Sequence, residues 1–126
     1  MQQVVPALRI TDDARSTAFY VDGLGFHVDW EHREEPRLPV FMQVSRDGLT
    51  LYLTEHAGDC QVGGLVHLYV PDVDAWYAEC LRKGVPVAEA PNESLEGLRD
   101  MTVADPDGNQ LRICTRLDAA PAQPGG

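Results

Sequence analysis

The chain has 126 residues, a net charge of −10 and 44% hydrophobic residues. It is long enough for one globular domain with a hydrophobic core and too short for two full-sized domains. No apolar run approaches the roughly 20 residues that a membrane-spanning helix needs, and the N-terminus lacks the basic and apolar segments of a signal peptide. The acidic balance argues against a nucleic acid or an anionic membrane as partner and favours cationic partners.

Cysteine usage and the end of the chain add two expectations. Cys60, Cys80 and Cys114 form an odd set without the spacing of a zinc site. We therefore expect reduced thiols and a cytoplasmic protein. Residues 119–126 contain two prolines and two glycines and no apolar period, so we expect a disordered tail after a single domain of residues 1–118.

The first half of the chain, residues 4–56, predicts the order β-α-β-β-β. A strand at 7–10 is followed by Asp12, whose carboxylate can cap a helix that runs through Tyr20. The glycines that follow end this helix. Three strands are expected next, at 26–31, 40–45 and 50–54, with a turn at Asp47-Gly48 before the last.

The second half, residues 63–116, predicts the same order. A strand at 67–70 precedes the cap residue Asp72, a helix through Arg82 and a stop at Gly84. The apolar residues of this helix recur at i, i+3, i+4, i+7 and i+8, which predicts one buried stripe: Val73, Trp76, Tyr77, Cys80 and Leu81. The strands expected after it are 86–88, 99–103 and 110–114. A doubled unit of this kind indicates an α+β fold.

The segment that opens the last strand carries an unusual cation. Pro106 and Gly108 predict a tight turn after Asp105. On the strand that follows, side chains alternate between two faces, so Arg112 lies on the face opposite Leu111. That arrangement puts an arginine on a face that we expect to line a cavity.

Four segments in this order carry a family resemblance: VVPAL (4–8), LGF (24–26), DVDA (72–75) and DPDGN (105–109). Together they resemble the glyoxalase / bleomycin resistance protein family of the vicinal oxygen chelate superfamily, over residues 4–116. The resemblance implies two βαβββ modules, at about 4–56 and 63–116, that form a curved mixed sheet with a central cleft and with the helices outside. It also implies a homodimer.

Enzymes of this superfamily hold a divalent metal with His and Glu side chains on four strands. The resemblance puts these four positions on Val5, Tyr52, Leu65 and Arg112. Valine and leucine have no donor atom, tyrosine is a rare ligand, and arginine is permanently cationic. We therefore expect no metal, no cofactor and no catalysis.

The remaining features resemble the metal-free antibiotic-binding branch. Pro6 stands where that branch has the hinge that lets the first strand cross to the partner subunit. The branch binds bleomycin-type glycopeptides in clefts at the dimer interface. The resemblance thus implies a homodimeric bleomycin resistance protein that sequesters a cationic, aromatic antibiotic.

Such a ligand needs aromatic faces for its rings and carboxylates or π faces for its amines. The candidate aromatic residues are Trp30, Phe41, Tyr52 and Tyr69, and the candidate carboxylates are Asp29, Glu31, Glu34, Glu35 and Asp100. His67 shares strand parity with Tyr69, so we expect it in the same cavity. Trp30 is equally compatible with a rim position, Trp76 is expected in the core, and His56 is expected to fix a loop.

Arg112 has three interpretations. It neutralises a carboxylate in the cavity, from Asp100 or a ligand, or it pairs with Glu55 or another acid, or it lies at the dimer interface. Two other functions stay open. One is a metal-dependent lyase, isomerase or dioxygenase with a displaced site that uses His67 with His56 or Tyr52. The other is a metal-free binder of another small aromatic metabolite.

Overall fold

The computed structural model describes residues 2–117. The N-terminal module consists of strand β1 (Ala7–Arg9), helix α1 (Asp13–Thr17), the π-helical turn η1 (Ala18–Gly23), and strands β2 (His27–His32), β3 (Phe41–Arg46) and β4 (Leu49–Thr54). The C-terminal module consists of strand β5 (Leu65–Tyr69), helix α2 (Val73–Lys83), and strands β6 (Glu89–Leu95), β7 (Leu98–Ala104) and β8 (Gln110–Arg116).

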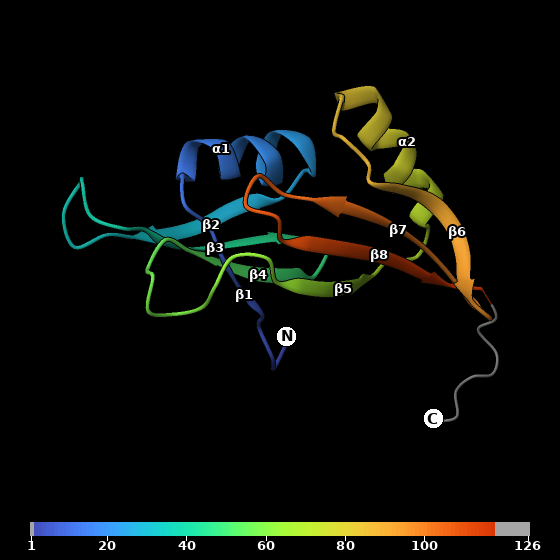
Figure 1. Ribbon diagram of the computed structural model, residues 1–126, viewed down its shortest axis with the longest axis horizontal. Helices are drawn as coiled ribbons and strands as arrows, with labels where there is room; N and C mark the ends of the chain where they lie inside the picture. The colour runs from blue at the N-terminus through green and yellow to red at the C-terminus, as the bar shows by residue number, and fades with distance from the viewer. Residues whose placement is uncertain (1, 118–126) are drawn as a thin grey trace.

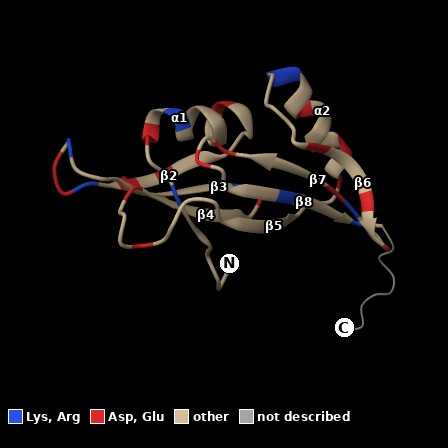
Figure 2. Cartoon of the chain, viewed as in Figure 1, with Lys and Arg blue, Asp and Glu red and all other residues tan. Residues whose placement is uncertain are grey.

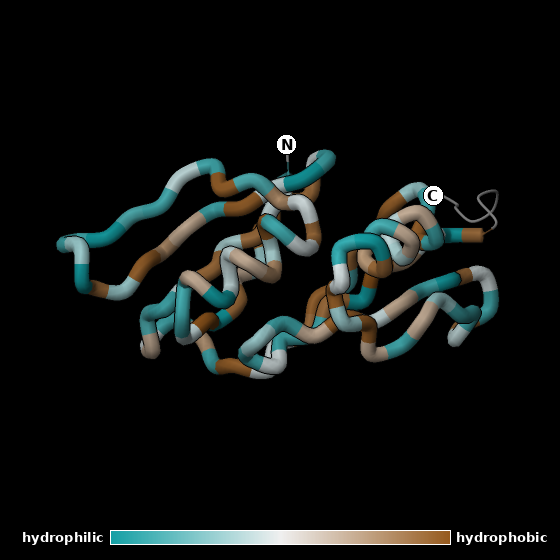
Figure 3. The backbone as a smooth tube through the Cα atoms, turned by 90° about the horizontal axis from the view of Figure 1, so that it is seen from above, coloured by the Kyte–Doolittle hydropathy of each residue, from teal (hydrophilic) through white to brown (hydrophobic). Residues whose placement is uncertain are grey.

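Each module forms its own four-stranded mixed sheet. The strand orders are β1-β4-β3-β2 and β5-β8-β7-β6. The first strand of each module pairs in parallel with the last, and the other pairs are antiparallel. Figure 1 shows α1 and α2 on the same side of the two sheets, and Figure 3, seen from above, shows the modules beside each other. The α+β class and the doubled βαβββ order are confirmed.

Both helices begin at the predicted aspartates. The Asp12 carboxylate accepts hydrogen bonds from the backbone N–H groups of Ala14 and Arg15, at 3.0 and 3.3 Å. Asp72 accepts one from the N–H of Ala75 at 3.2 Å. Helix α2 ends at Gly84, whose φ of 74° is open to glycine and strained for other residues. The matching caps explain why both halves of the chain start their helices at equivalent points.

Two predicted elements differ from the structure by more than two residues. The first helical segment continues past Tyr20 as η1, because the N–H of Leu24 still bonds to the carbonyl of Phe19 at 2.9 Å. The strand expected at 86–88 is absent, and β6 starts at Glu89. Pro86 has no N–H for a ladder, while Val85 is buried and its N–H bonds back to the helix at Cys80. The chain therefore finishes packing against the core before it joins the sheet.

One hydrophobic core serves both modules. Leu53 from β4 and Leu111 and Ile113 from β8 are fully buried on the helix side of the sheets. Trp76 of α2 is buried and makes an edge contact with Phe26, at 6.4 Å between ring centroids, which confirms its expected core position. The predicted burial of Leu81 is wrong: this residue lies at the edge of the helical stripe and is exposed. The two modules are therefore packed into one body by aromatic and aliphatic side chains.

The turn at 105–109 ties the modules together. Gly108 has a φ of 80°, as its position in the turn requires. The buried Asn109 donates from Nδ2 to the carbonyl of Arg9 and accepts from the N–H of Gly64, both at 2.8 Å. Thr11 donates to the carboxylate of Asp107 from its backbone and its hydroxyl. The DPDGN motif thus links β8 to the start of both modules.

Other predictions from the sequence have different outcomes. Within residues 2–117 no helix is both long and apolar enough to cross a membrane. The three cysteines are free. The expected tail at 119–126 lies outside the described residues. The strand exchange at Pro6 stays a prediction, since in the single chain the Pro6 carbonyl accepts from Tyr52 and β1 pairs with its own β4.

Candidate functional site

The face of each sheet opposite the helices is here called the open face. Side chains alternate along the strands, so Met42 and Val44 of β3 are buried in the core while Phe41, Gln43 and Ser45 lie on the open face. The same alternation puts Tyr52 of β4 on the open face, directly opposite Gln43 in the register. This face carries the candidate binding residues of the N-terminal module.

Three predicted aromatic residues meet on this face and form an aromatic cluster of Trp30, Phe41 and Tyr52. The rings of Trp30 and Phe41 are stacked, with centroids 6.0 Å apart and planes 12° from parallel. Tyr52 is tilted against both, at 5.9 Å from Trp30 and 5.0 Å from Phe41. Trp30 keeps 43% of its surface exposed. The cluster therefore offers an accessible π face held by three adjacent strands.

A β-bulge aims Trp30 at this cluster. Val28 pairs with Val44 on the core side, and strict alternation would send Trp30 to the same side. The register shifts between Val28 and Trp30, so Trp30 pairs with Gln43 and joins the open face. The extra residue is Asp29, which the sequence pattern did not identify as a bulge.

Asp29 supplies a carboxylate beside the aromatic cluster. It accepts hydrogen bonds from Gln43 Nε2 at 2.9 Å and from Ser45 Oγ at 3.0 Å. The bond from Gln43 has the larger effect and the bond from Ser45 the smaller one, and together they hold the pKa of the exposed Asp29 carboxyl below its ordinary value. Gln43 and Ser45 were missed in the sequence, although their spacing of two and four residues from Phe41 puts them on its face.

The other four predicted site residues form a second group, on the open face of the C-terminal sheet. His67 of β5 lies opposite Arg112 of β8, and Tyr69 lies opposite Cys114, which in turn pairs with Asp100 of β7. His67 Nδ1 is 3.9 Å from Cys114 Sγ. The guanidinium of Arg116, which the sequence did not single out, lies 4.2 Å above the Tyr69 ring. The predicted site residues thus fall into two groups, one on each sheet.

Arg112 lines a cavity of about 260 Å³ on this open face, with Ala88, Glu89, Thr102, Ala104 and Gln110. Its predicted pairing with Glu55 is wrong. Glu55 lies in the N-terminal module, where it accepts from the N–H groups of Asp13 and Val40 and lies 3.8 Å from Arg33. Asp100 accepts from Ser94 and forms no recorded ion pair with Arg112 among residues 2–117.

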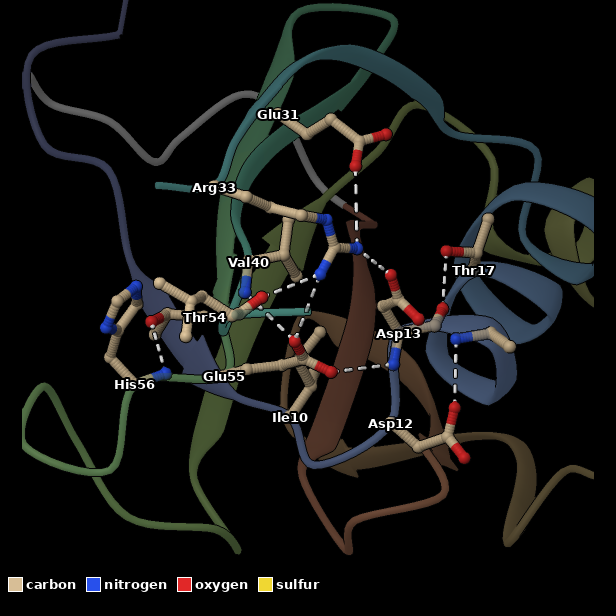
Figure 4. Close-up of polar contacts among 12 residues, drawn as sticks. Ile10, Asp12, Asp13, Thr17, Glu31, Arg33, Val40, Thr54, Glu55 and His56 are labelled. Carbon is tan, nitrogen blue, oxygen red and sulfur yellow. Dashed lines mark hydrogen bonds and ion pairs between the residues drawn. The ribbon is translucent and has the colours of Figure 1, made fainter. Parts of the chain in front are cut away.

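A charged network around Arg33 ties the β2–β3 loop to α1 (Figure 4). Arg33 donates to the carbonyl of Leu38 at 2.9 Å and pairs with Asp13, Glu31 and Glu55. The Glu31 side chain is therefore directed to this network and away from the aromatic cluster. Glu34 and Glu35 lie in the exposed β2–β3 loop, and Glu34 Oε2 is 3.6 Å from Nε2 of His32 at the end of β2.

The metal positions implied by the resemblance do not fit a metal ion. Leu65 is exposed on the open face without a donor atom, and Arg112 brings a positive charge. Within residues 2–117 no group of three or more His, Cys, Asp or Glu side chains is arranged to hold a metal. His56 is held in a loop, where its N–H donates to Thr54 Oγ1 at 3.0 Å (Figure 4). The structure does not join His56 and His67 into a ligand set.

The chain carries an excess of negative charge, with 20 Asp and Glu residues against 10 Lys and Arg residues and a net charge of −10. Figure 2 shows acidic and basic residues together on α1, on α2 and in the β2–β3 loop. A field of this sign attracts cations toward the molecule.

Comparisons with known proteins agree with this fold. A model for the family described as "Glyoxalase superfamily protein" matches residues 1–120. No curated protein matches the chain. Two solved structures are similar at 24% identity: a bleomycin-binding protein complexed with bleomycin (TM-score 0.74; 92% of this chain and 99% of that chain) and a bleomycin resistance determinant encoded on transposon Tn5 (TM-score 0.75; 92% and 98%).

A third similar structure is an antibiotic binding protein from Streptomyces sp. CB03234, at 22% identity and a TM-score of 0.72, covering 92% of this chain and 97% of that chain. At these identities the structural matches show a shared fold.

Proposed function

Since the chain belongs to the glyoxalase superfamily, we propose that it binds and sequesters a bleomycin-type antibiotic, cationic and aromatic, without catalysis. We place this activity in a cytoplasmic homodimer. The observation that carries the proposal is the aromatic cluster of Trp30, Phe41 and Tyr52 on the open face, with the ionised Asp29 beside it.

The chemistry of this surface suits a flat cation. The stacked pair Trp30 and Phe41 offers an exposed π face for a heteroaromatic ring. The Asp29 carboxylate and the electron-rich ring faces both attract an amine. Two structural neighbours whose names refer to bleomycin, at 24% identity, support this choice of ligand class.

The absence of catalysis is proposed on the chemistry of the four family metal positions. Val5 and Leu65 have no donor atom, and Arg112 is a cation where enzymes of the superfamily use a carboxylate. Tyr52, at the fourth position, is engaged with Trp30 and Phe41 in the aromatic cluster. This donor set favours binding over metal-assisted chemistry.

Calorimetric titration with bleomycin tests the proposal. We expect measurable binding at or below tens of micromolar, because sequestration requires tight binding at low drug concentration. Trp30→Ala removes one stacking face and should weaken binding about tenfold or more.

Leu81→Ala is the matched control, since Leu81 is an exposed apolar residue on α2, away from the open face. It should leave the affinity unchanged. Absence of heat with the unmodified protein at tens of micromolar would falsify the antibiotic assignment. If the Trp30→Ala variant and the unmodified protein bind bleomycin with equal affinity, the aromatic cluster is not part of the binding site.

A further inference from the structure

We propose that the open face of the C-terminal module holds a second subsite, in which Arg112 binds an anionic group of an aromatic ligand. Carboxylate, sulfonate and phosphate share the required chemistry. This subsite goes beyond the proposed function, which depends on the aromatic cluster of the other sheet. It implies a ligand with a negative group separate from its cationic, aromatic part.

The first observation is that Arg112 has no partner among residues 2–117. Five arginines are half-buried: Arg9, Arg33, Arg46, Arg99 and Arg112. The first four each donate to a carbonyl or a carboxylate within 3.3 Å. No hydrogen bond or ion pair of Arg112 is recorded in the described part of the chain. A partly desolvated guanidinium without an acceptor is costly, so it indicates a missing anion.

The second observation is the space in front of it. The cavity of about 260 Å³ is lined by Arg112, Gln110 and Thr102, which present guanidinium, amide and hydroxyl groups, and by Ala88 and Ala104. This volume is several times the roughly 30 Å³ that a water molecule occupies in the liquid. A planar guanidinium recognises two oxygens of one carboxylate or sulfonate together, which makes arginine suited to such a group.

The third observation is an aromatic surface near the cation. Tyr69 lies on β5 two residues beyond His67, the direct cross-strand partner of Arg112. Arg116, four residues along β8, holds its guanidinium over the Tyr69 ring. The open face of this sheet thus combines two cations with a ring, which suits an anion attached to an aromatic group.

One carboxylate in this cavity would repel a bound anion, so its removal tests the proposed subsite. Glu89 lines the same cavity at its exposed side, on β6, beyond Thr102. It forms no recorded ion pair with Arg112 among residues 2–117. Its negative charge should weaken anion binding at Arg112, so its removal should strengthen it. The two variants Arg112→Met and Glu89→Gln are thus expected to act in opposite directions.

The experiment is a fluorescence titration with two probes that share one ring system. 8-Anilino-1-naphthalenesulfonate carries the anion, and N-phenyl-1-naphthylamine lacks it. We expect Arg112→Met to weaken sulfonate binding about tenfold and to change binding of the uncharged probe less than twofold. Glu89→Gln should tighten sulfonate binding about threefold. Arg82→Gln, which removes one positive charge from an exposed position of α2, should leave the affinities for both probes unchanged.

Three outcomes overturn the subsite: sulfonate binding that Arg112→Met leaves within twofold, an equal loss for both probes, or no saturable sulfonate binding by the unmodified protein. The first outcome together with dissociation of an oligomer would assign Arg112 to a subunit contact instead. The bleomycin titration is independent. If Arg112→Met keeps its bleomycin affinity and loses the sulfonate, both proposals stand; if bleomycin alone fails to bind, only the proposed function falls.

Discussion

At the scale of single residues, the buried Asp105 shows how one carboxylate organises a turn. It accepts hydrogen bonds from the N–H of Asp107, from the backbone and side chain of Asn109, and from the Tyr20 hydroxyl at 2.8 Å. Tyr20 is fully buried. Burial first, and then the charge of Asp105, raise the pKa of the Tyr20 hydroxyl far above its ordinary value of 10.0.

Replacement of Tyr20 by phenylalanine tests this contact. At pH 8 the free energy of unfolding should fall by about 2 kcal/mol, because a hydrogen bond to a charged group is lost. The raised pKa keeps the folded Tyr20 neutral, so its stabilising contribution is present below pH 10 and is lost above it. At pH 11 ionisation of the unfolded tyrosine removes about 1.4 kcal/mol from the native protein and nothing from the variant.

Urea unfolding at pH 8 and pH 11 measures both effects. The difference in free energy of unfolding between the native protein and the Tyr20→Phe variant should therefore become smaller as the pH rises. Tyr77→Phe is the control at pH 8, since Tyr77 is half-buried and makes no recorded side-chain hydrogen bond among residues 2–117. It should change stability by less than about 0.5 kcal/mol. A difference that stays constant or grows with pH would contradict the assignment.

At the scale of elements, the β2–β3 hairpin carries two members of the aromatic cluster, and Arg33 fastens its loop to α1. The side chain of Arg33 is 24% exposed and lies among Asp13, Glu31 and Glu55. Without the cation, three carboxylates would face one another, and the Leu38 carbonyl would lose its donor. The network therefore holds the loop beside the sheet that presents Trp30.

We expect Arg33→Met to lower the free energy of unfolding by about 2 kcal/mol, between the values for exposed and fully buried pairs. Urea denaturation followed by tryptophan fluorescence measures it. Arg37→Met in the same loop is the control, because Arg37 is exposed and has no recorded ion pair among residues 2–117. Equal stability of the two variants would show that the network around Arg33 contributes nothing.

Strand boundaries mark the limit of prediction for the elements. The helices were predictable because Asp12, Asp72 and Gly84 each act on the nearest turn of backbone. The bulge at Asp29 was not, because it depends on the pairing of β2 with β3. The start of β6 likewise depends on the burial of Val85, which the sequence does not show.

At the scale of the whole molecule, the open faces leave large apolar side chains exposed. Trp30, Leu65 and Tyr69 are each more than 40% exposed, on two sheets of one chain. Exposed apolar groups that gather on one side of a molecule favour a contact with a second protein. We therefore expect a homodimer in which the open faces contribute to the subunit contact.

Size-exclusion chromatography with light scattering at micromolar concentration should give twice the chain mass of 13.9 kDa. Leu65→Asp puts a charge on the open face and should shift the protein toward monomer, since a buried unpaired charge is costly. Leu81→Asp makes the same change on the exposed side of α2 and should leave the dimer intact. A monomer in the unmodified protein would contradict the composite clefts implied by the resemblance.

The sequence alone determined the doubled βαβββ order, the two helix caps and the DPDGN turn, because these depend on contacts between near neighbours in the chain. It also identified Trp30, Phe41 and Tyr52. Only the tertiary structure decided that these three rings meet, that Arg33 forms an ion pair with Glu55, and that Arg112 has no partner among residues 2–117. Strand register and long-range charge pairing decide such contacts, and both arise from the packing of distant segments.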